Sequence, residues 1–431
     1  MTGMDEFFDV VIVGTGAAGL YCALHLPQRM RVLLLTKCRA DESDSFLAQG
    51  GICMLRGEDD VAPYREDTLR AGHYENDEGA VDLMIRSSNG VIRDLVRRGV
   101  RFARNPDGSL AFTREGAHSR PRILYHEDIT GREITRTLLD EARTRSNLTI
   151  REETALLDFI SDDTACGGIV ALAPDGTIYT VRANAVVLAC GGIGGLFRNS
   201  TNFPHITGDA IAMAMRHGVA VEHLDYIQIH PTTLYSRKPG RRFLISESVR
   251  GEGALLYDKN GQRFTNELQP RDLLTDAIHA QMEKDGTDFV WEDMRPLGED
   301  TIRSHFPNIC ERCEEEGYNP FWEPIPVVPA QHYFMGGIKV DLASRTRMPR
   351  LYACGETSCN GVHGRNRLAS NSLLESLVFA QRAADDILFG QAPDFSCEAP
   401  DLAPYREPGP LFADYRKEVL DAMERMKQSH E

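Results

Sequence analysis

The sequence lacks the features that mark several classes of protein. No stretch approaches the roughly 18 consecutive apolar residues that cross a bilayer. Basic residues are in the minority, since 48 Lys and Arg stand against 64 Asp and Glu, which leaves a net charge of −16. Proteins that follow nucleic-acid phosphates or bind anionic membranes carry a basic face. We therefore expect neither a nucleic acid nor a membrane as a partner.

Cysteine is also sparse, with 10 residues scattered through 431. They do not form the dense framework of a disulfide-rich secreted domain. Cys310 and Cys313 form a CxxC pair, but no second pair of ligands follows at the spacing of a zinc site. The first residues are acidic and lead directly into a predicted strand, unlike a signal peptide. We expect a cytoplasmic protein with reduced thiols and no bound metal.

The strongest pattern that is present lies near the start of the chain. A β-branched run at Asp9–Val13 leads into a GxGxxG motif, followed by a predicted helix at Leu20–Leu26 and a predicted strand at Arg31–Thr36; the motif reads Gly14, Thr15, Gly16, Ala17, Ala18, Gly19. This order is that of a βαβ unit. In such a unit Gly14 permits the tight turn, Gly16 lets the backbone approach a pyrophosphate, and Gly19 lets the helix pack against the strand. The pattern predicts a dinucleotide at the N-terminus of the helix.

The end of the second strand departs from the usual dinucleotide fingerprint. An acidic residue normally holds the ribose there, whereas this strand ends in Thr36 and Lys37. The departure disfavours NAD as the ligand. A lysine at this place can instead lie near adenosine or phosphate groups.

Three predicted strands run into glycine residues, at Asp9–Gly14, Ala185–Gly192 and Leu351–Glu356. We expect them to share one sheet around a single nucleotide site. Other predicted elements are helices at 79–98 and 134–143 and short strands between 148 and 188.

The predicted fold is α/β: a Rossmann-type nucleotide-binding domain with an inserted α+β capping domain and a short helical C-terminal tail. The expected bounds are 1–221 and 332–395 for the nucleotide-binding domain, 222–331 for the inserted domain and 396–431 for the tail. The tail is rich in proline before it turns helical from Leu411, and we expect it to be peripheral.

Several polar segments carry residue types that a buried core does not favour. Arg271 and Arg367 can each hold a carboxylate through paired hydrogen bonds. His230 and His332 can add hydrogen bonds to the same ligand. Taken alone, each of these residues could equally be a surface residue or a buried residue whose hydrogen bonds are satisfied within the core. As a set they predict a site for a dicarboxylate of about four carbons.

Nine segments occur in order between residues 7 and 390: GTGAAGL, LAQGGI, HEDITGREI, IQIHPT, ESVRGEGA, PRD, HYFMGGIKVD, YACGE and NRLASNSLLE. Together they resemble the flavoproteins of the succinate dehydrogenase and fumarate reductase family, and within it the L-aspartate oxidases. The resemblance implies that the nucleotide-binding domain binds FAD. Matched position by position, it implies FAD contacts at Gly14, Thr15, Gly16, Ala17, Ala18, Gly19, Lys37, Asp44, Ser45, Ala48, Gln49, Gly50, Gly51, Asp209, Glu356, Ser372 and Leu373.

The same resemblance implies roles around the substrate. His230, His332 and Arg367 would contact it, with Thr232 or Ser246 nearby. Arg271 corresponds to the proton-transfer arginine of the family. A guanidinium is almost always protonated, so we interpret Arg271 as a well-placed donor that shuttles a proton only in the transition state. Arg250 and Glu252 would continue the relay to solvent.

Two positions separate the branches of the family. The respiratory members attach FAD covalently through a histidine, and the aligned residue here is Asp44, so we expect noncovalent FAD. The segment Phe112–Ser119 matches the L-aspartate oxidase version of a loop near the substrate. Glu115 in this loop would supply a negative charge for the substrate ammonium, which succinate lacks.

The implied reaction is hydride transfer from the α-carbon of L-aspartate to flavin N5, which leaves iminoaspartate. It is the first step of de novo NAD synthesis through quinolinate, and iminoaspartate would pass to quinolinate synthase. Oxygen or fumarate would reoxidise the flavin. We expect the inserted domain to close over the flavin.

Other functions remain open. The same fold serves a soluble fumarate reductase that oxidises succinate, which turnover without an amino acid would reveal. A flavin-binding protein without turnover would not require the set Glu115, His230, Arg271, His332 and Arg367. A flavoprotein that acts on tRNA is disfavoured by the net charge of −16. The L-aspartate oxidases usually continue into a helical C-terminal domain, and we do not expect the tail from Pro400 to supply it.

Overall fold

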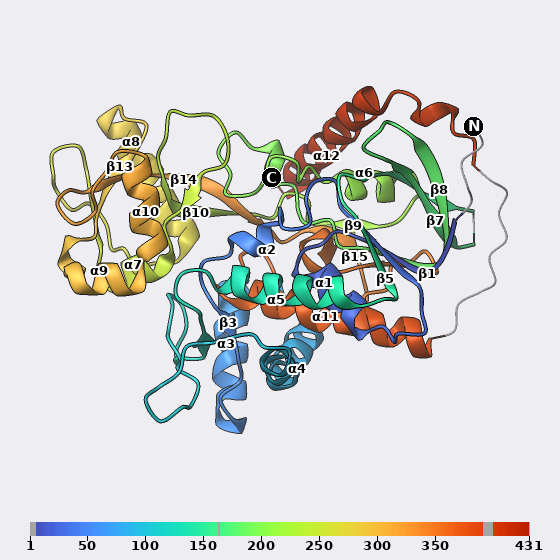
Figure 1. Cartoon of the computed structure of the whole chain (residues 1–431). Helices are drawn as coiled ribbons and strands as arrows, with labels where there is room; N and C mark the ends of the chain where they lie inside the picture. The colour runs from blue at the N-terminus through green and yellow to red at the C-terminus, as the bar shows by residue number, and fades with distance from the viewer. Residues whose placement is uncertain (1–5, 163, 391–399, 431) are drawn as a thin grey trace.

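The computed structural model describes residues 6–162, 164–390 and 400–430. Figure 1 shows two lobes: a large one built on a seven-stranded sheet and a small one, on the left, built on a five-stranded sheet. The small lobe is one stretch of chain from Ile227 to Phe334. The predicted α/β fold with a second, inserted unit of helices and strands is confirmed.

The large sheet has the order β5-β2-β1-β8-β7-β6, and β16 also pairs with β8. Its strands are β1 (Glu6–Val13), β2 (Val32–Leu35), β5 (Leu148–Arg151), β6 (Ala155–Ser161), β7 (Cys166–Leu172), β8 (Ile178–Leu188) and β16 (Leu351–Ala353). The pairing is parallel between β5 and β2, β2 and β1, β1 and β8, and β8 and β16. It is antiparallel between β8 and β7 and between β7 and β6. The prediction that the three strands leading into glycines share one sheet is therefore confirmed.

Helices cover both faces of this sheet, which explains why β1 is apolar along its whole second half. Val10 and Ile12 pack into the core on one face, and Val11 and Val13 into the core on the other. The first face carries α1 (Ala17–His25), α5 (Thr130–Thr144) and α11 (Asn371–Phe389), with α3 (Val61–Ala71) and α4 (Glu78–Arg97) outside them. The second face carries α6 (Asp209–Arg216) and α12 (Pro408–His430).

Helix α1 begins at Ala17, three residues before the predicted start at Leu20. Gly16 is extended, with φ −72° and ψ −179°, and acts as the N-cap. The helix therefore starts inside the glycine motif, which brings its free amide groups to the end of β1.

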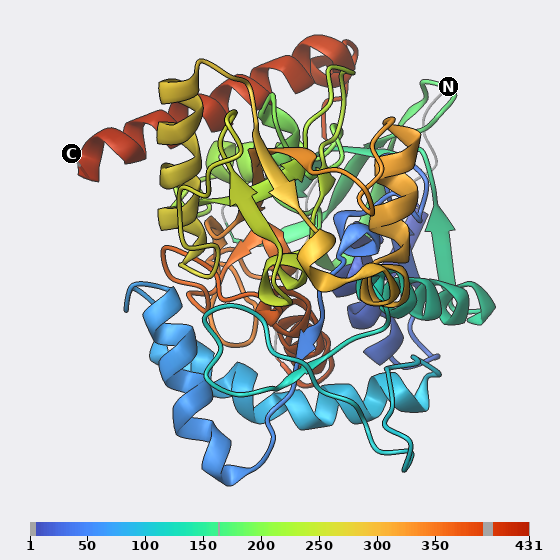
Figure 2. The same ribbon diagram turned by 90° about the vertical axis from the view of Figure 1, so that its left-hand side faces the viewer.

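The C-terminal helix differs from the prediction that the tail is peripheral. Tyr415, Val419 and Ala422 of α12 are buried in the core that α6 and the large sheet share. The hydroxyl of Tyr415 donates a hydrogen bond of 2.7 Å to the carbonyl oxygen of Leu157 on β6. The prediction was wrong because these residues, spaced four and three apart, belong to an apolar stripe that packs against this core and also includes Leu411, Phe412, Met423 and Met426. Figure 2 shows α12 running across the top of the molecule.

The small lobe contains an antiparallel sheet of order β11-β10-β14-β13-β12, covered by short helices. Its elements are β10 (Ile227–Leu234), β11 (Phe243–Leu244), α7 (Glu247–Gly251), β12 (Leu255–Tyr257), α8 (Arg271–Asp285), β13 (Val290–Asp293), η3 (Arg295–Leu297), α9 (Glu299–His305), α10 (Pro307–Glu315) and β14 (Ile325–Phe334). β10 and β14 form a ribbon between the lobes. Val327 packs in the small core, whereas Phe334 packs in the core of the large lobe.

Short elements complete the large lobe. They are α2 (Asp44–Leu47), β3 (Ile52–Cys53), η1 (Glu58–Asp60), β4 (Ile123–Leu124), η2 (Gly194–Leu196), β9 (Val221–Glu222), β15 (Gly337–Lys339), η4 (Gly355–Thr357), β17 (Ser358–Cys359) and η5 (Ala403–Tyr405). Among the described helices none has the length and apolar character needed to span a bilayer.

Candidate active site

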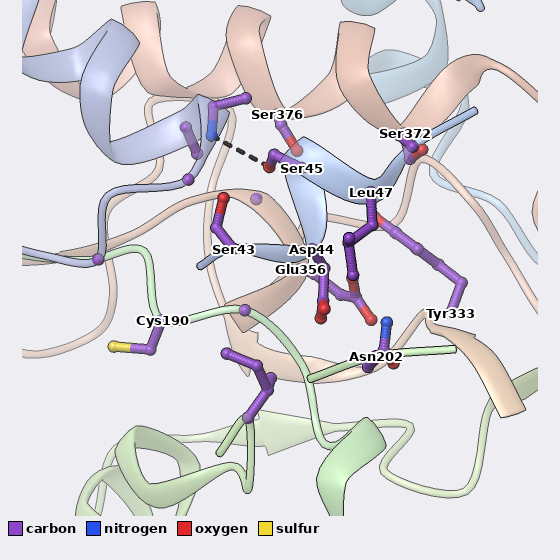
Figure 3. A pocket seen from close by; sticks show the side chains of 18 of the residues that line it. Ser43, Asp44, Ser45, Leu47, Cys190, Asn202, Tyr333, Glu356, Ser372 and Ser376 are labelled. Carbon is purple, nitrogen blue, oxygen red and sulfur yellow. Dashed lines mark hydrogen bonds between the residues drawn. The ribbon is translucent and has the colours of Figure 1, made fainter. Parts of the chain in front are cut away.

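A pocket lies where the parallel strands of the large sheet end and the small lobe meets them. Segments that follow β1, β2, β8 and β16 line it, together with side chains of β10, α8 and β14. The predicted residues that line it are Gly14, Thr15, Gly16, Ala17, Ala18, Lys37, Asp44, Ser45, Ala48, Gln49, Gly50, Gly51, Glu115, Asp209, His230, Ser246, Arg271, His332, Glu356, Arg367, Ser372 and Leu373. Figure 3 shows part of this lining, with the 44–47 segment beside Glu356 and Asn202.

We call the part around the glycine motif, Lys37 and Asp209 the nucleotide end. Gly14 has φ +115°, and a Cβ atom on it would lie 2.0 Å from the carbonyl oxygen of Ala189, so only glycine fits. The amide of Ala17 donates a hydrogen bond of 3.1 Å to Oγ of Ser45, drawn in Figure 3. Backbone amide groups and the start of α1 thus border the pocket, as anion binding requires.

Lys37 and Asp209, both predicted to contact FAD, pair with each other. The Lys37 ammonium lies 2.5 Å from the Asp209 carboxylate and 3.3 Å from Oγ1 of Thr207. It also lies 5.3 Å from the centre of the Phe412 ring on α12. The C-terminal helix therefore supports a side chain that borders the nucleotide end.

Asp44 and Glu356 are half-buried carboxyl groups that line the pocket. Asp44 accepts a hydrogen bond of 2.9 Å from the amide of Phe203, and burial raises the pKa of Asp44 to about 7. Glu356 accepts one from the amide of Phe334 at 2.9 Å, and burial raises the pKa of Glu356 to about 8. Both groups therefore hold a proton more readily than an exposed carboxylate.

We call the part around Glu115, His230, Arg271, His332 and Arg367 the reaction end. Arg271, the first residue of α8, forms an ion pair of 2.6 Å with Glu247 of α7 and donates a hydrogen bond of 2.8 Å to the Gln228 side chain. Burial opposes the charge of Glu247, but Arg271 and Arg250 outweigh it, so the pKa of Glu247 is lowered. The guanidinium of Arg271 is thus held in place from two sides.

Arg367 lies on the opposite wall, in the loop before α11. It donates a hydrogen bond of 3.0 Å to Oγ of Ser372, and its guanidinium lies 4.5 Å from the centre of the Tyr333 ring. Burial, with the nearby charge of Arg271, lowers the pKa of Arg367 to about 10. Both guanidinium groups line the reaction end, and Arg367 forms no ion pair with a described residue, so this end favours a ligand that carries carboxylates.

His230 on β10 and His332 on β14 lie next to each other, with ring centres 5.2 Å apart. Burial lowers the pKa of both well below the ordinary value; Arg271 adds to the effect on His230 and Arg367 to that on His332. Nδ1 of His332 lies 2.8 Å from Oγ1 of Thr201. At neutral pH both rings are uncharged, and the tautomer whose Nδ1 accepts a hydrogen bond, from the Thr232 amide or the Thr201 hydroxyl, leaves Nε2–H to donate to a ligand.

Glu115 borders the same space from the loop before β4. It is 6% exposed, and Oγ of Ser370 donates a hydrogen bond of 2.6 Å to its carboxylate. Burial, followed by the charge of Glu247, raises the pKa of Glu115. The reaction end therefore holds a carboxylate opposite two arginines, which suits a ligand with both signs of charge.

Four residues singled out from the sequence do not line the pocket. Gly19 lies under it, where a Cβ atom would meet the Gly14 carbonyl oxygen at 2.0 Å. Arg250 is buried behind Glu247 and donates a hydrogen bond of 2.7 Å to the carbonyl oxygen of Glu267. Thr232 is buried beside His230, and Glu252 lies near the surface, 2.8 Å from His305.

Sequence reasoning missed Glu247, Gln228, Ser370 and Arg241, all of which contact site residues or line the pocket. Glu247 begins the charged segment around Arg250, so a charge partner for an arginine was a signal that could have found it. Ser370 lies inside the NRLASNSLLE segment but gives no signal of its own.

Several buried polar atoms of the lining have no hydrogen-bond partner among the described residues: Ser43 Oγ, Asp44 Oδ2, Gln49 Oε1, Asn202 Oδ1, His230 Nε2 and Arg367 Nε. Buried polar groups are normally satisfied, so these atoms are suited to a polar ligand. Together with the glycine turn and the amides of α1, they fit an elongated nucleotide cofactor such as FAD, with a smaller acidic ligand at the reaction end. Within the described ranges no cluster of three potential metal ligands occurs.

Comparison with known proteins agrees with this geometry. The family described as FAD binding domain matches residues 9–373. The L-aspartate oxidase of Clostridium acetobutylicum is 50% identical over 380 residues, which are 88% of this chain and 87% of that protein. The L-aspartate oxidase of Nostoc is 47% identical over 392 residues, 88% of this chain and 67% of that protein.

Solved structures lead to the same family. A variant of the E. coli quinol fumarate reductase chain FrdA superposes with a TM-score of 0.83 at 33% identity, covering 89% of this chain and 70% of that one. A quinol-fumarate reductase with menaquinol superposes with a TM-score of 0.85 at 32% identity, covering 95% and 75%. The predicted resemblance is confirmed: the chain belongs to the FAD-binding flavoproteins of the succinate dehydrogenase and fumarate reductase family, in the group of the L-aspartate oxidases.

Proposed function

We propose that this protein is an FAD-dependent enzyme that oxidises L-aspartate to iminoaspartate. The observation that carries the proposal is the convergence of Arg271, Arg367 and Glu115 on one end of a pocket whose other end is a dinucleotide-binding turn. Two cations and one anion match the two carboxylates and the ammonium of aspartate. The relatives named L-aspartate oxidase support the same substrate.

In this proposal each side chain has a defined task. Arg367 and His332 hold one carboxylate of the substrate, and Arg271 and His230 hold the other. Glu115 accepts hydrogen bonds from the ammonium group. When bound, FAD supplies the acceptor for the hydride that leaves the α-carbon. The protein contributes orientation, exclusion of water and fixed charges.

The cofactor would lie along the predicted contacts, with its phosphates at Gly14–Ala18 and its flavin beside the segment Asp44–Gly51 and Glu356. Asp44 stands where a covalent linkage would need a histidine, so the proposal includes noncovalent FAD. The small lobe would be the capping domain, which the sequence predicts at 222–331.

Proton movement in this proposal follows a row of buried charges. Arg271 faces the pocket, and its Nε lies 2.6 Å from Glu247. Arg250 is buried behind them and is among the charges that lower the pKa of Glu247. Oxidation removes a hydride from the α-carbon and a proton from the nitrogen of L-aspartate, so this row would carry protons away from the substrate. The Arg271 guanidinium would donate a proton only in the opposite half-reaction, when fumarate takes up a hydride and a proton, while Glu247 compensates its charge. Glu252, near the surface, would complete the path to solvent.

Oxygen or fumarate is the proposed electron acceptor. Fumarate is a dicarboxylate, so it can occupy the same arginine pair after the imine has left. The reaction would be the first step of NAD synthesis through quinolinate, with iminoaspartate passed to quinolinate synthase. A cytoplasmic location belongs to the same proposal, and the free thiols of the described cysteines support it.

An anaerobic titration of the purified yellow protein tests this function. L-aspartate and succinate are added separately while the flavin absorbance is followed. Bleaching by L-aspartate is the expected result. Bleaching by succinate alone would contradict the proposal and favour a fumarate reductase. Absence of bleaching by either compound would contradict both oxidations.

A further inference from the structure

Ser370 has an unusual backbone and an unusual hydrogen bond. It is the N-cap of α11, yet its side chain does not cap that helix, and its φ of +62° lies in the left-handed region. A serine at an N-cap normally accepts a hydrogen bond from the start of its own helix. Such strain in a residue other than glycine persists only where the surroundings impose it, and it often marks a functional position.

The hydroxyl of Ser370 joins two segments of the pocket. Its oxygen accepts a hydrogen bond of 3.2 Å from the amide of Gly51, and it donates one of 2.6 Å to Glu115. Because a hydroxyl has a single proton and the Gly51 contact uses its oxygen as an acceptor, that proton points to the Glu115 carboxylate. The carbonyl oxygen of Ser370 also accepts from the amide of Cys53 at 3.1 Å, which fixes the residue in place.

The charge of Glu115 depends on this hydrogen bond because some neighbouring groups oppose a negative charge there and others favour it. Burial and the Glu247 carboxylate oppose its charge, whereas Arg271 of α8, Arg367 before α11 and the Ser370 hydroxyl favour it. Throughout the described ranges, Ser370 is the one hydrogen-bond donor to this carboxylate.

The loop that carries Glu115 is itself firmly anchored. Arg122 is fully buried and pairs with Asp60 at 2.9 Å and Asp67 at 2.6 Å. His118 lies 3.0 Å from the carbonyl oxygen of Ala369, next to Ser370. Before Glu115, Thr113 pairs with Ile123 of β4 through backbone hydrogen bonds of 2.9 and 3.1 Å. The loop backbone is therefore fixed on both sides of Glu115, and the Ser370 hydroxyl controls what remains free, the direction and charge of the carboxylate.

We propose that Ser370 is a positioning residue that holds Glu115 charged and aimed at the substrate ammonium, and so selects an amino-dicarboxylate over an unsubstituted one. This inference rests on the proposed function, in which Glu115 receives the ammonium. Succinate and fumarate lack that group, so Ser370 makes no difference to them.

Two variants separate the hydroxyl from the backbone strain. Ser370→Ala removes the hydroxyl and keeps the left-handed strain, whereas Ser370→Gly removes the hydroxyl and relieves it. Ser88→Ala is the matched control. Ser88 is also buried, and its hydroxyl accepts from the amide of Leu55 at 3.0 Å and donates to the carbonyl oxygen of Ile85, but it does not line the pocket.

The measurement is calorimetric binding to the anaerobic, photoreduced holoenzyme, which binds L-aspartate but cannot oxidise it. We expect both Ser370 variants to bind L-aspartate on the order of tenfold more weakly at pH 7, because a hydrogen bond to a charged group is lost. Succinate should bind within about twofold of wild type, as should both ligands to Ser88→Ala. Loss of the hydroxyl should raise the pKa of Glu115, so that less of it is charged at pH 7. The loss of L-aspartate affinity should therefore become smaller as the pH rises above that pKa. In the oxidised enzyme the acid limb of kcat/KM for L-aspartate should shift to higher pH.

Other results would overturn the inference. Equal weakening for L-aspartate and succinate, or loss of flavin from both variants, would make Ser370 a structural residue of the flavin loop. Unchanged L-aspartate binding in both variants would remove it from substrate selection. Wild-type protein that L-aspartate fails to bleach would instead contradict the proposed function, so the two failures are distinguishable.

Discussion

The nucleotide end and the reaction end of the pocket present different kinds of chemical group to a ligand. At the nucleotide end, backbone atoms dominate: Gly14 leaves no room for a Cβ atom, and the start of α1 presents amide groups. At the reaction end, charged side chains dominate: Arg271 and Arg367 face Glu115, and Glu247 supports Arg271. The glycine turn of the nucleotide end comes from one contiguous motif, beside which Lys37 and Asp209 form an ion pair, whereas the charged groups of the reaction end come from both lobes.

This difference determines how each end can fail. A backbone site is destroyed when an atom is added, because the turn cannot move away from the neighbouring strand. A charged site is destroyed when a charge is removed, because the groups left behind are buried without compensation. Substitutions of the first kind should remove the cofactor, and those of the second kind should remove the substrate or the reaction.

Gly14→Ala should have the largest effect. The new Cβ atom would lie 2.0 Å from the Ala189 carbonyl oxygen at a φ of +115°, so crowding and strain together should cost about 3–5 kcal/mol. We expect protein without flavin, measured by the ratio of flavin to protein absorbance, and a lowered melting temperature. Gly176→Ala is the control, since Gly176 has φ +84° but open space around it. A Gly14→Ala protein that still carries a full complement of bound flavin would contradict the view that the glycine turn makes the cofactor site.

Arg367→Leu should separate the two ends most clearly. Removal of one partner of a buried charge pair costs about 3–5 kcal/mol, so kcat/KM for L-aspartate should fall by about 10³-fold while FAD stays bound. Anaerobic flavin bleaching measures the loss. Arg365→Leu serves as the control because Arg365 is 61% exposed and outside the pocket lining. Unchanged kinetics in Arg367→Leu would remove Arg367 from the substrate site.

Glu247→Gln should act on rate more than on binding. The amide keeps the shape of the side chain but removes the charge that lies 2.6 Å from Arg271. We expect kcat to fall by roughly 10²-fold with a small change in KM, as for loss of assistance to proton transfer. Steady-state kinetics at several pH values provide the measurement. Glu299→Gln, which breaks a surface pair with Arg303, should leave kcat unchanged. A rise in KM alone would indicate that Glu247 only orients the substrate.

Glu292→Gln should have the smallest effect, on stability. Glu292 of β13 is fully buried near Arg250 and Glu267, no described residue hydrogen-bonds its carboxyl oxygens, and burial raises the pKa to about 8. The folded protein therefore keeps a proton between about pH 4.5 and 8 that the unfolded chain releases, so stability falls as pH rises through this window. The variant has no such proton, and its melting temperature should exceed that of wild type by a few degrees at pH 8 and less at pH 6. If the melting temperatures of both proteins depended on pH in the same way, Glu292 would not be a buried carboxyl group that keeps its proton in the folded state.

The two ends also differ in how far they could be predicted from the sequence. The residues Gly14–Gly19 carry their own geometry, so the turn, the helix and the parallel strands follow from local rules. The pair Arg271–Glu247 and the bond from Ser370 to Glu115 join residues that only the folded chain brings together. Hydrophobic patterns with a period of two or 3.6 residues indicate which side chains are buried, but they do not indicate which residues contact one another. The apolar stripe of α12 was readable, but its pattern does not tell which surface it covers, which is why the tail was wrongly expected to be peripheral.

The ribbon of β10 and β14 has a consequence for how the chain acquires its structure. Because the small lobe is the uninterrupted stretch Ile227–Phe334, all of its strands are synthesised before β16 (Leu351–Ala353). Its two ends leave side by side through paired strands, so the insertion costs the large lobe little loop-closure entropy. Domains that are contiguous in sequence tend to fold as units during synthesis. The small lobe can therefore form early, whereas the nucleotide-binding sheet must wait for a strand that the ribosome delivers after it.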